Sequence, residues 1–155
     1  MQSAHDGREE TEDEKLDRNW GELLQELRIT QTGLQLLSGF LLTLPFTQVF
    51  AGLDDGQQGL YLGLVVLAAV AVGLNLTPVM LHRRVFGDHV KGRVVEVGHV
   101  LSQAVIAAVA LLVTGTVTLI FSVVVDWTSG LVAGVLLSVV LVVLLAVVPR
   151  RFEPR

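Results

Sequence analysis

The sequence contains no cysteine among its 155 residues, and it carries little charge. Without cysteine the chain forms no disulfide and offers no thiolate for a metal or for nucleophilic catalysis. Charged residues make up only 17% of the chain, below the roughly 25% of a typical soluble domain. The patterns of a serine hydrolase, a P-loop, a Rossmann fingerprint and a zinc protease are absent as well. We therefore expect no catalytic residue, no enzyme activity, no bound cofactor and no nucleic-acid partner.

The hydrophobic residues, 52% of the chain, gather in four long stretches. A membrane-spanning helix needs about 20 mostly apolar residues, and inside lipid the backbone must satisfy its own hydrogen bonds as a helix. The sequence therefore predicts an all-α fold, an integral membrane four-helix bundle of up-down-up-down order preceded by an amphipathic N-terminal helix. The first stretch is the most polar, and Pro45 is expected to kink it. The predicted spans cover about residues 29–53, 57–82, 96–124 and 128–149.

All 11 Lys and Arg residues lie in three places: the N-terminal arm, the loop between the second and third stretches, and the tail 150–155. The only charged residues in the other two loops are Asp54, Asp55 and Asp126. Positive residues flanking spans mark the cytoplasmic side. We therefore expect a multi-pass protein of the cytoplasmic (inner, plasma) membrane, with its N- and C-termini and the tail 150–155 in the cytoplasm.

The N-terminal arm divides into an acidic tail, residues 1–10, expected to be disordered, and an amphipathic cytoplasmic helix, residues 11–28. Thr11 and Glu14 have the spacing of a capping box, which predicts the start of this helix. Two interpretations of its apolar face stay open: contact with the lipid interface, or docking on a partner or a second copy. Residues 9–28 carry a net charge of −5, which an anionic inner leaflet repels, and this favours the partner. The apolar face consists of Leu16, Trp20, Leu23 and Leu27.

Two groups of polar residues border the second and third stretches. His82, Arg83 and Arg84 end the second stretch, where they either anchor the topology or bind anionic lipid headgroups. Glu96 and His99 have the Glu-x-x-His spacing of di-iron bundles, but such a site needs a second pair and two more glutamates. We therefore expect these two residues to lie at the membrane boundary without a metal.

Small residues at a spacing of four suggest where helices approach closely. Such small faces pack either within the bundle or between copies in a homo-oligomer, and both interpretations stay open. Gln35 is expected to form hydrogen bonds between helices. The small faces contain Gly59 and Gly63 in the second stretch, and Gly130, Gly134 and Ser138 in the fourth.

Three segments carry a resemblance: Leu23–Arg28 (LLQELR), Phe40–Phe46 (FLLTLPF), and Pro78 followed by His82-Arg83. Together they resemble a family of short actinobacterial membrane proteins of unknown function, over about residues 16–150. The resemblance implies a four-span inner-membrane topology and no established activity. Some members have been labelled sodium:proton antiporters, a label for which the near absence of intramembrane carboxylates here offers no physical support.

Two functional hypotheses follow. The first is a non-catalytic accessory or interaction protein that acts through its acidic amphipathic helix, with a membrane protein or a second copy as partner. The alternative is a small oligomeric ion or solute transporter or channel, which should show polar residues along one face of several spans. Only the first stretch shows them, including Gln31, Gln35 and Gln48. Anionic lipid headgroups at the cytoplasmic face are expected partners in both cases.

Overall fold

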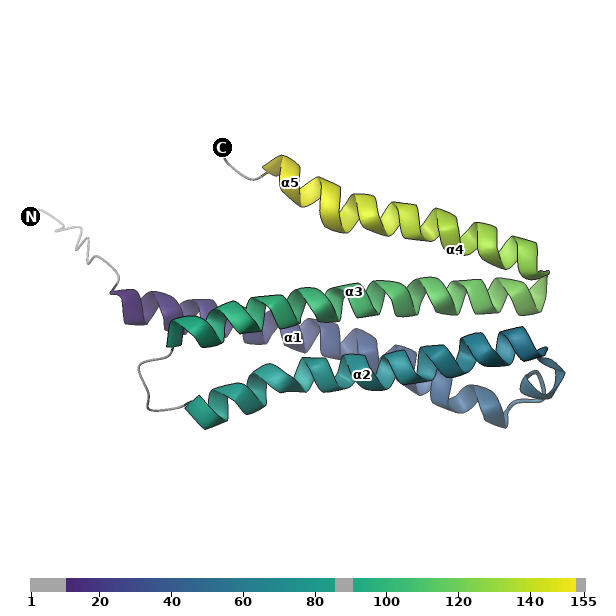
Figure 1. The fold of residues 1–155 in the computed structure, drawn as a ribbon, viewed down its shortest axis with the longest axis horizontal. Helices are drawn as coiled ribbons and strands as arrows, with labels where there is room; N and C mark the ends of the chain where they lie inside the picture. The colour runs from purple at the N-terminus through teal and green to yellow at the C-terminus, as the bar shows by residue number, and fades with distance from the viewer. Residues whose placement is uncertain (1–10, 86–90, 153–155) are drawn as a thin grey trace, which may run out of the picture.

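The computed structural model describes residues 11–85 and 91–152. Almost all of them are helical, and the predicted all-α fold is confirmed. Figure 1 shows α1, α2 and α3 side by side, with α4 along one side of α3. The helices are α1 (Glu12–Thr43), α2 (Asp55–Val85), α3 (Lys91–Val124) and α4 (Trp127–Val142), and α4 continues through a π-helical segment (Val143–Val147) into α5 (Val148–Phe152).

The start of α1 agrees with the predicted capping box. The backbone N–H of Glu14 donates to the Thr11 hydroxyl at 3.3 Å, and the Thr11 N–H donates to the Glu14 carboxylate at 2.9 Å. These hydrogen bonds, first from the Thr11 backbone and then from its hydroxyl, lower the pKa of Glu14 below its ordinary value. From Glu12 the helix runs without a break to Thr43, so the predicted cytoplasmic helix and the first span are one helix. The predicted tail, residues 1–10, lies outside the described residues.

The end of α1 corrects the predicted first span. The α-helix stops at Thr43, although the uncharged stretch continues to Leu53. Pro45 lacks a backbone N–H, and its ring clashes with the preceding turn of a helix. The chain accordingly tightens into a 3₁₀ turn at Leu44–Phe46 and a second one at Phe50–Gly52 before α2 begins. Pro45 thus ends the helix instead of kinking it.

The up-down order of the helices is visible in Figure 1: the start of α1 and the end of α5 lie toward one end, and the α3–α4 turn lies at the other. That turn is as tight as predicted, because α3 ends at Val124 and α4 begins at Trp127. The Asp126 carboxylate accepts a hydrogen bond from the Ser129 backbone N–H at 2.7 Å and so caps α4.

The main core lies between α1, α2 and α3. Its packing is close because small side chains alternate with leucines: Ala71 is fully buried, and a Cβ added at Gly115 would overlap the Leu64 side chain. The Tyr61 hydroxyl is satisfied in this core, since it donates to the Leu41 carbonyl at 3.1 Å. The buried members are Leu34, Leu41, Tyr61, Leu64, Ala68, Ala71, Val105, Ala108, Leu112 and Leu119.

Helix α4 has a different environment from the other three. Along its length it packs on α3 and on its own continuation, and it reaches the start of α2 only at its first residue, where the Trp127 side chain lies against Gly56. Gly130 and Gly134 are the buried residues of α4, and its long apolar side chains are mostly exposed. Figure 1 shows α4 close to α3 at the Trp127 end and farther from it toward α5. The bundle is therefore a three-helix core with a fourth helix attached to one member.

Three helices of the described part are long and apolar enough to cross a membrane: Asp55–Met80, Val97–Val124 and Trp127–Val147. This supports a membrane protein. Helix α1 is not among them, because it contains Glu26, Arg28 and several glutamines.

Candidate functional site

Three of the four residues in the apolar face of the N-terminal arm lie inside the chain, and the side chain of the fourth, Leu16, lies outside the described residues. Trp20, Leu23 and Leu27 form a second buried cluster, with exposed fractions of 9%, 1% and 3%. Gly98 of α3 makes this docking close: a Cβ there would overlap the Leu23 side chain and would lie 3.5 Å from the Trp20 ring. The prediction that these three residues contact lipid or a partner is therefore wrong. These residues pack inside the chain because α3 lies beside the N-terminal part of α1 and has a glycine, Gly98, at the point where Leu23 approaches it.

Polar contacts fix the level of α1 against its neighbours. The Ser102 hydroxyl of α3, itself buried, donates to the Glu26 carboxylate at 3.3 Å. On the other side the Asn75 amide of α2 donates to the Leu27 carbonyl at 3.1 Å. Both Ser102 and Asn75 belong to the apolar spans Val97–Val124 and Asp55–Met80. The charged end of α1 thus runs beside apolar parts of α2 and α3.

Asn75 organises the polar contact between α1 and α2. Its amide group donates to the Thr30 hydroxyl at 3.0 Å as well as to Leu27, and the Thr30 hydroxyl donates to the Leu27 carbonyl at 2.9 Å. Asn75 is only 4% exposed. A buried carboxamide in an apolar span is stable when it has such partners.

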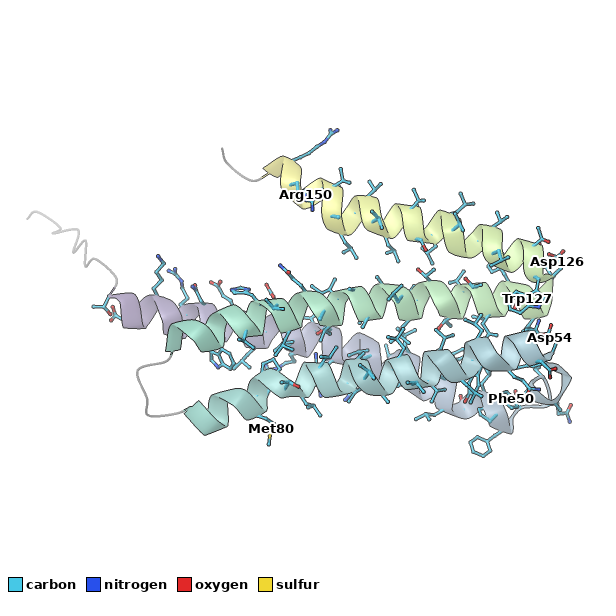
Figure 2. All side chains as sticks on the ribbon, viewed as in Figure 1. Phe50, Asp54, Met80, Asp126, Trp127 and Arg150 are labelled. Atoms are coloured by element: carbon cyan, nitrogen blue, oxygen red, sulfur yellow. The ribbon has the colours of Figure 1, made fainter. Side chains whose placement is uncertain are left out.

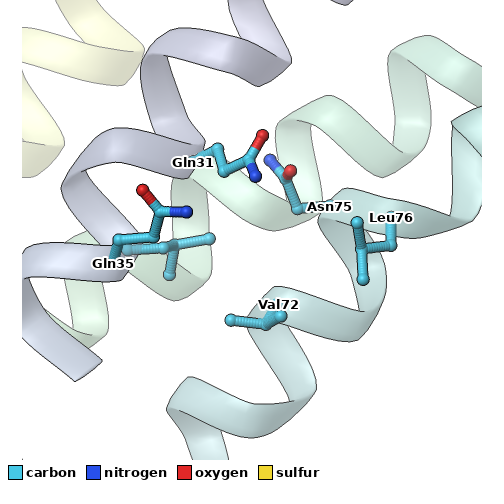
Figure 3. Close-up of a pocket in the computed structure, with 6 residues that line it drawn as sticks. Gln31, Gln35, Val72, Asn75 and Leu76 are labelled. Atoms are coloured by element: carbon cyan, nitrogen blue, oxygen red, sulfur yellow. The ribbon is translucent and has the colours of Figure 1, made fainter. Parts of the chain in front are cut away.

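A pocket of about 50 Å³ opens beside this contact. Figure 3 shows the carboxamides of Gln31 and Gln35 in this pocket together with that of Asn75. Leu34 and Asn75 form its buried floor, and the other lining residues are exposed, so the pocket opens onto the outer surface between α1 and α2. A pocket of this size accommodates a few waters or one small polar group. The lining residues are Gln31, Leu34, Gln35, Val72, Asn75 and Leu76.

The opposite end of the molecule is tied by a second polar cluster. Asp54 and Gln57 bond reciprocally, with the Gln57 N–H donating to the Asp54 carboxylate at 2.8 Å and the Asp54 N–H donating to the Gln57 side chain at 3.1 Å. The Trp127 indole donates to Asp54 at 2.9 Å, and the Gln57 amide donates to the Ser122 carbonyl at 3.0 Å. Figure 2 shows Asp54 and Trp127 together at this end. The Gln57 backbone N–H first, and then the indole, lower the pKa of Asp54 below its ordinary value.

The two small-residue motifs have different environments. Gly130 and Gly134 are buried against Thr118 and Ser122 of α3, as predicted for packing within the bundle. Ser138, on the same helix, is half-buried.

Gly59 and Gly63 are exposed, and a Cβ added at either would meet no heavy atom within 4 Å. The prediction that these two residues pack within the bundle is therefore wrong. The alternative that they face a second copy stays a prediction. Gln35 lies in the pocket described above.

Several predicted site residues lie where only the backbone is described. Leu16 is in α1, His82, Arg83 and Arg84 end α2, and Glu96 is in α3, but their side chains lie outside the described residues. His99 is exposed, close to the start of the apolar span Val97–Val124. Within the part of the chain that the structure describes, no three His, Asp or Glu side chains are grouped as a metal site would require.

Several polar contacts were not predicted, and they include Tyr61–Leu41 and Gln57–Ser122. The Asp54-x-x-Gln57 spacing is a capping signature that the sequence does contain. For the Trp127–Asp54 and Ser102–Glu26 contacts, each partner lies more than 70 residues from the other, so no local pattern relates them.

Residues 9–149 match the family described as "Family of unknown function (DUF6328)", which covers most of the chain, and the chain therefore belongs to this family. The predicted membership of an uncharacterised family is thus confirmed. No curated protein and no solved structure matches the chain.

Proposed function

We propose that this member of the DUF6328 family is a non-catalytic accessory or interaction protein of the cytoplasmic membrane, with four crossings and both termini in the cytoplasm. Three apolar helices and the segregation of all Lys and Arg support this topology. The fourth crossing is the uncharged part of α1 from Ile29 to Thr43, about 22 Å long at 1.5 Å per residue, continued by the 3₁₀ turn at Leu44–Phe46. A short span of this kind is compatible with local thinning of the bilayer.

The burial of Trp20, Leu23 and Leu27 on Gly98 is the observation that carries the proposed function. Because Trp20, Leu23 and Leu27 are buried inside the chain, these three residues are not available to insert into the lipid interface. The exposed side of the arm carries Glu14 and Glu22 together with Lys15 and Arg18, and Arg18 lies 3.9 Å from Glu22. The acidic balance comes from the sequence, in which residues 9–28 hold eight acids and three bases. We infer that the arm presents a net acidic surface on a rigid support. Pre-organised surfaces lose little conformational entropy on binding, and charge complementarity selects the partner. The partner that fits is a protein with a basic surface at the cytoplasmic face.

One observation favours the alternative, a small oligomeric ion or solute transporter or channel. The carboxamides of Gln31 and Gln35 are exposed on α1 at the level of the apolar spans, as in a helix that lines an aqueous path between copies. A pore of this kind requires an oligomer, so the mass of the purified protein in nanodiscs separates the two functions. A monomer without flux in liposomes leaves the interaction protein, whereas an oligomer that conducts a solute favours the transporter.

The interaction function is tested by photo-crosslinking in membranes of the full chain. A crosslinking amino acid replaces Gly21, which is exposed and has open space around it, and a control places it at the exposed Thr128 at the other end of the bundle. We expect one protein adduct of constant mass at position 21 and none at position 128. The variant Glu22→Lys, which leaves the capping box of Thr11 and Glu14 intact, and high salt should both remove the adduct, because the attraction is electrostatic. An adduct that survives both changes, or no adduct at position 21, would contradict the proposed function.

A further inference from the structure

Helix α1 carries a column of polar side chains along the pocket between α1 and α2. Arg28, Gln31 and Gln35 are separated by three and four residues, so they lie on one side of the helix, and all three are exposed. Figure 3 shows the two glutamine side chains in the pocket beside Asn75. At 1.5 Å per residue, Gln31 lies about 4.5 Å and Gln35 about 10.5 Å deeper along the helix than Arg28.

The Arg28 guanidinium has no ion pair within the described part of the chain. The nearest carboxylate in sequence, Glu26, is on the α3 side of the helix, where it accepts from Ser102. Arg28 follows Leu27, whose carbonyl accepts from Asn75, and it therefore lies beside the apolar span Asp55–Met80. An arginine at this level extends its side chain toward the membrane surface and requires an anion or water there.

We propose that Arg28, Gln31 and Gln35 bind one anionic phospholipid of the cytoplasmic leaflet. The proposal rests on the membrane crossing of α1 proposed above. The phosphate accepts two parallel hydrogen bonds from the Arg28 guanidinium, and this bidentate geometry is the one in which arginine binds phosphate best. The ester carbonyls, which lie deeper than the phosphate, accept from the amide N–H groups of Gln31 and Gln35. An acyl chain then continues over Val72 and Leu76, the exposed apolar walls of the pocket.

The size of the pocket agrees with a lipid whose ester group lies inside the pocket and whose headgroup lies outside it. About 50 Å³ is enough for an ester group but not for a headgroup, which stays at the surface with Arg28. A second copy fits the column less well. Two copies with the same orientation in the membrane, related by a two-fold axis along the membrane normal, would place the two Arg28 residues at the same level, with like charges opposed. Free phosphate would satisfy Arg28 but would leave the carboxamides and the apolar walls without a ligand.

The test measures binding of phosphatidylglycerol to the full chain by native mass spectrometry from detergent, with the thermal unfolding temperature as a second readout. The variants are Arg28→Gln and Gln35→Leu. The matched control is Arg150→Gln, which removes an exposed cation from α5, a segment of the chain that contacts neither α1 nor α2. Figure 2 shows Arg150 on α5.

We expect one retained phosphatidylglycerol per wild-type chain, about tenfold weaker binding in Arg28→Gln, and unchanged binding in Arg150→Gln. Gln35→Leu replaces an exposed carboxamide by an apolar side chain. We expect this variant to keep its fold, checked by circular dichroism, and to bind phosphatidylglycerol more weakly. Phosphatidylcholine and inorganic phosphate serve as the neutral lipid and the free anion.

Equal loss in Arg28→Gln and Arg150→Gln would reduce the effect to general charge and overturn the proposal. Stabilisation by inorganic phosphate as large as that by phosphatidylglycerol, or a lipid-free dimer that dissociates in Arg28→Gln, would overturn it as well. Crosslinking at position 21 should be the same in Arg28→Gln as in the wild type. A failure of the lipid site is therefore distinguishable from a failure of the interaction function.

Discussion

Substitution of Gly130 by alanine should loosen the contact between α3 and α4. A Cβ at this position would lie 2.7 Å from the backbone oxygen of Thr118 and 3.0 Å from both Cβ and the backbone N of Ser122. The first distance is about 0.7 Å short of the 3.4 Å at which ordinary contact begins. Two of the three atoms are backbone, so no rotamer change relieves the overlap. Since the backbone of α4 packs on α3 alone among the described helices, the overlap is relieved by a shift of α4 away from α3.

The magnitude follows from two opposing terms. Overpacking costs about 1–3 kcal/mol, whereas alanine is about 1 kcal/mol better than glycine inside a helix. Gly59→Ala provides the matched control, because a Cβ there meets nothing within 4 Å and only the second term applies. The two variants should therefore differ in free energy of unfolding by about 1–3 kcal/mol, with Gly130→Ala the less stable.

The assay is titration with sodium dodecyl sulfate in mixed micelles, followed by circular dichroism. A disulfide between two cysteines engineered at the α3–α4 contact adds a local readout, since the natural chain has no cysteine to interfere. Gly130→Ala should slow formation of that disulfide, and Gly59→Ala should leave it unchanged. Equal shifts of the same sign in both variants would refute the steric argument.

Two further predictions concern polar contacts. Asn75→Leu should destabilise the chain by about 0.5–2 kcal/mol because the two hydrogen bonds from α2 to α1, to the Leu27 carbonyl and to the Thr30 hydroxyl, are lost. The control Thr77→Val removes a hydroxyl that bonds only within its own helix, so it should change the unfolding temperature little, and equal effects of the two variants would contradict this. Folding lowers the pKa of Asp54, so its contribution to stability is fully present above about pH 4, the unfolded value, and is lost as the pH falls through the lower folded pKa. The range from about pH 5 to about pH 2 brackets an aspartate pKa. In this range Asp54→Asn should flatten the fall in unfolding temperature, measured by circular dichroism, and an unchanged slope would refute the contribution of Asp54.

Much of the fold could be read from the sequence because the signals are local. Thr11 and Glu14 specify the start of α1 through one hydrogen-bonded turn, and Asp126 starts α4 in the same way. The uncharged lengths of the second to fourth stretches predict helices because lipid allows the backbone no other hydrogen bonds. Pro45 was recognised as an interruption, but whether it kinks or ends a helix depends on what the following turn can pack against.

The faces of the helices were decided by the tertiary structure alone. In a soluble protein a polar side marks the outside, but in a membrane both the core and the lipid are apolar, so composition does not separate them. Gly59-x-x-x-Gly63 and Gly130-x-x-x-Gly134 have the same pattern, and only the second is packed within the chain. The apolar face of the arm indicated that it must be covered, and only the placement of Gly98 beside Leu23 identified what covers it.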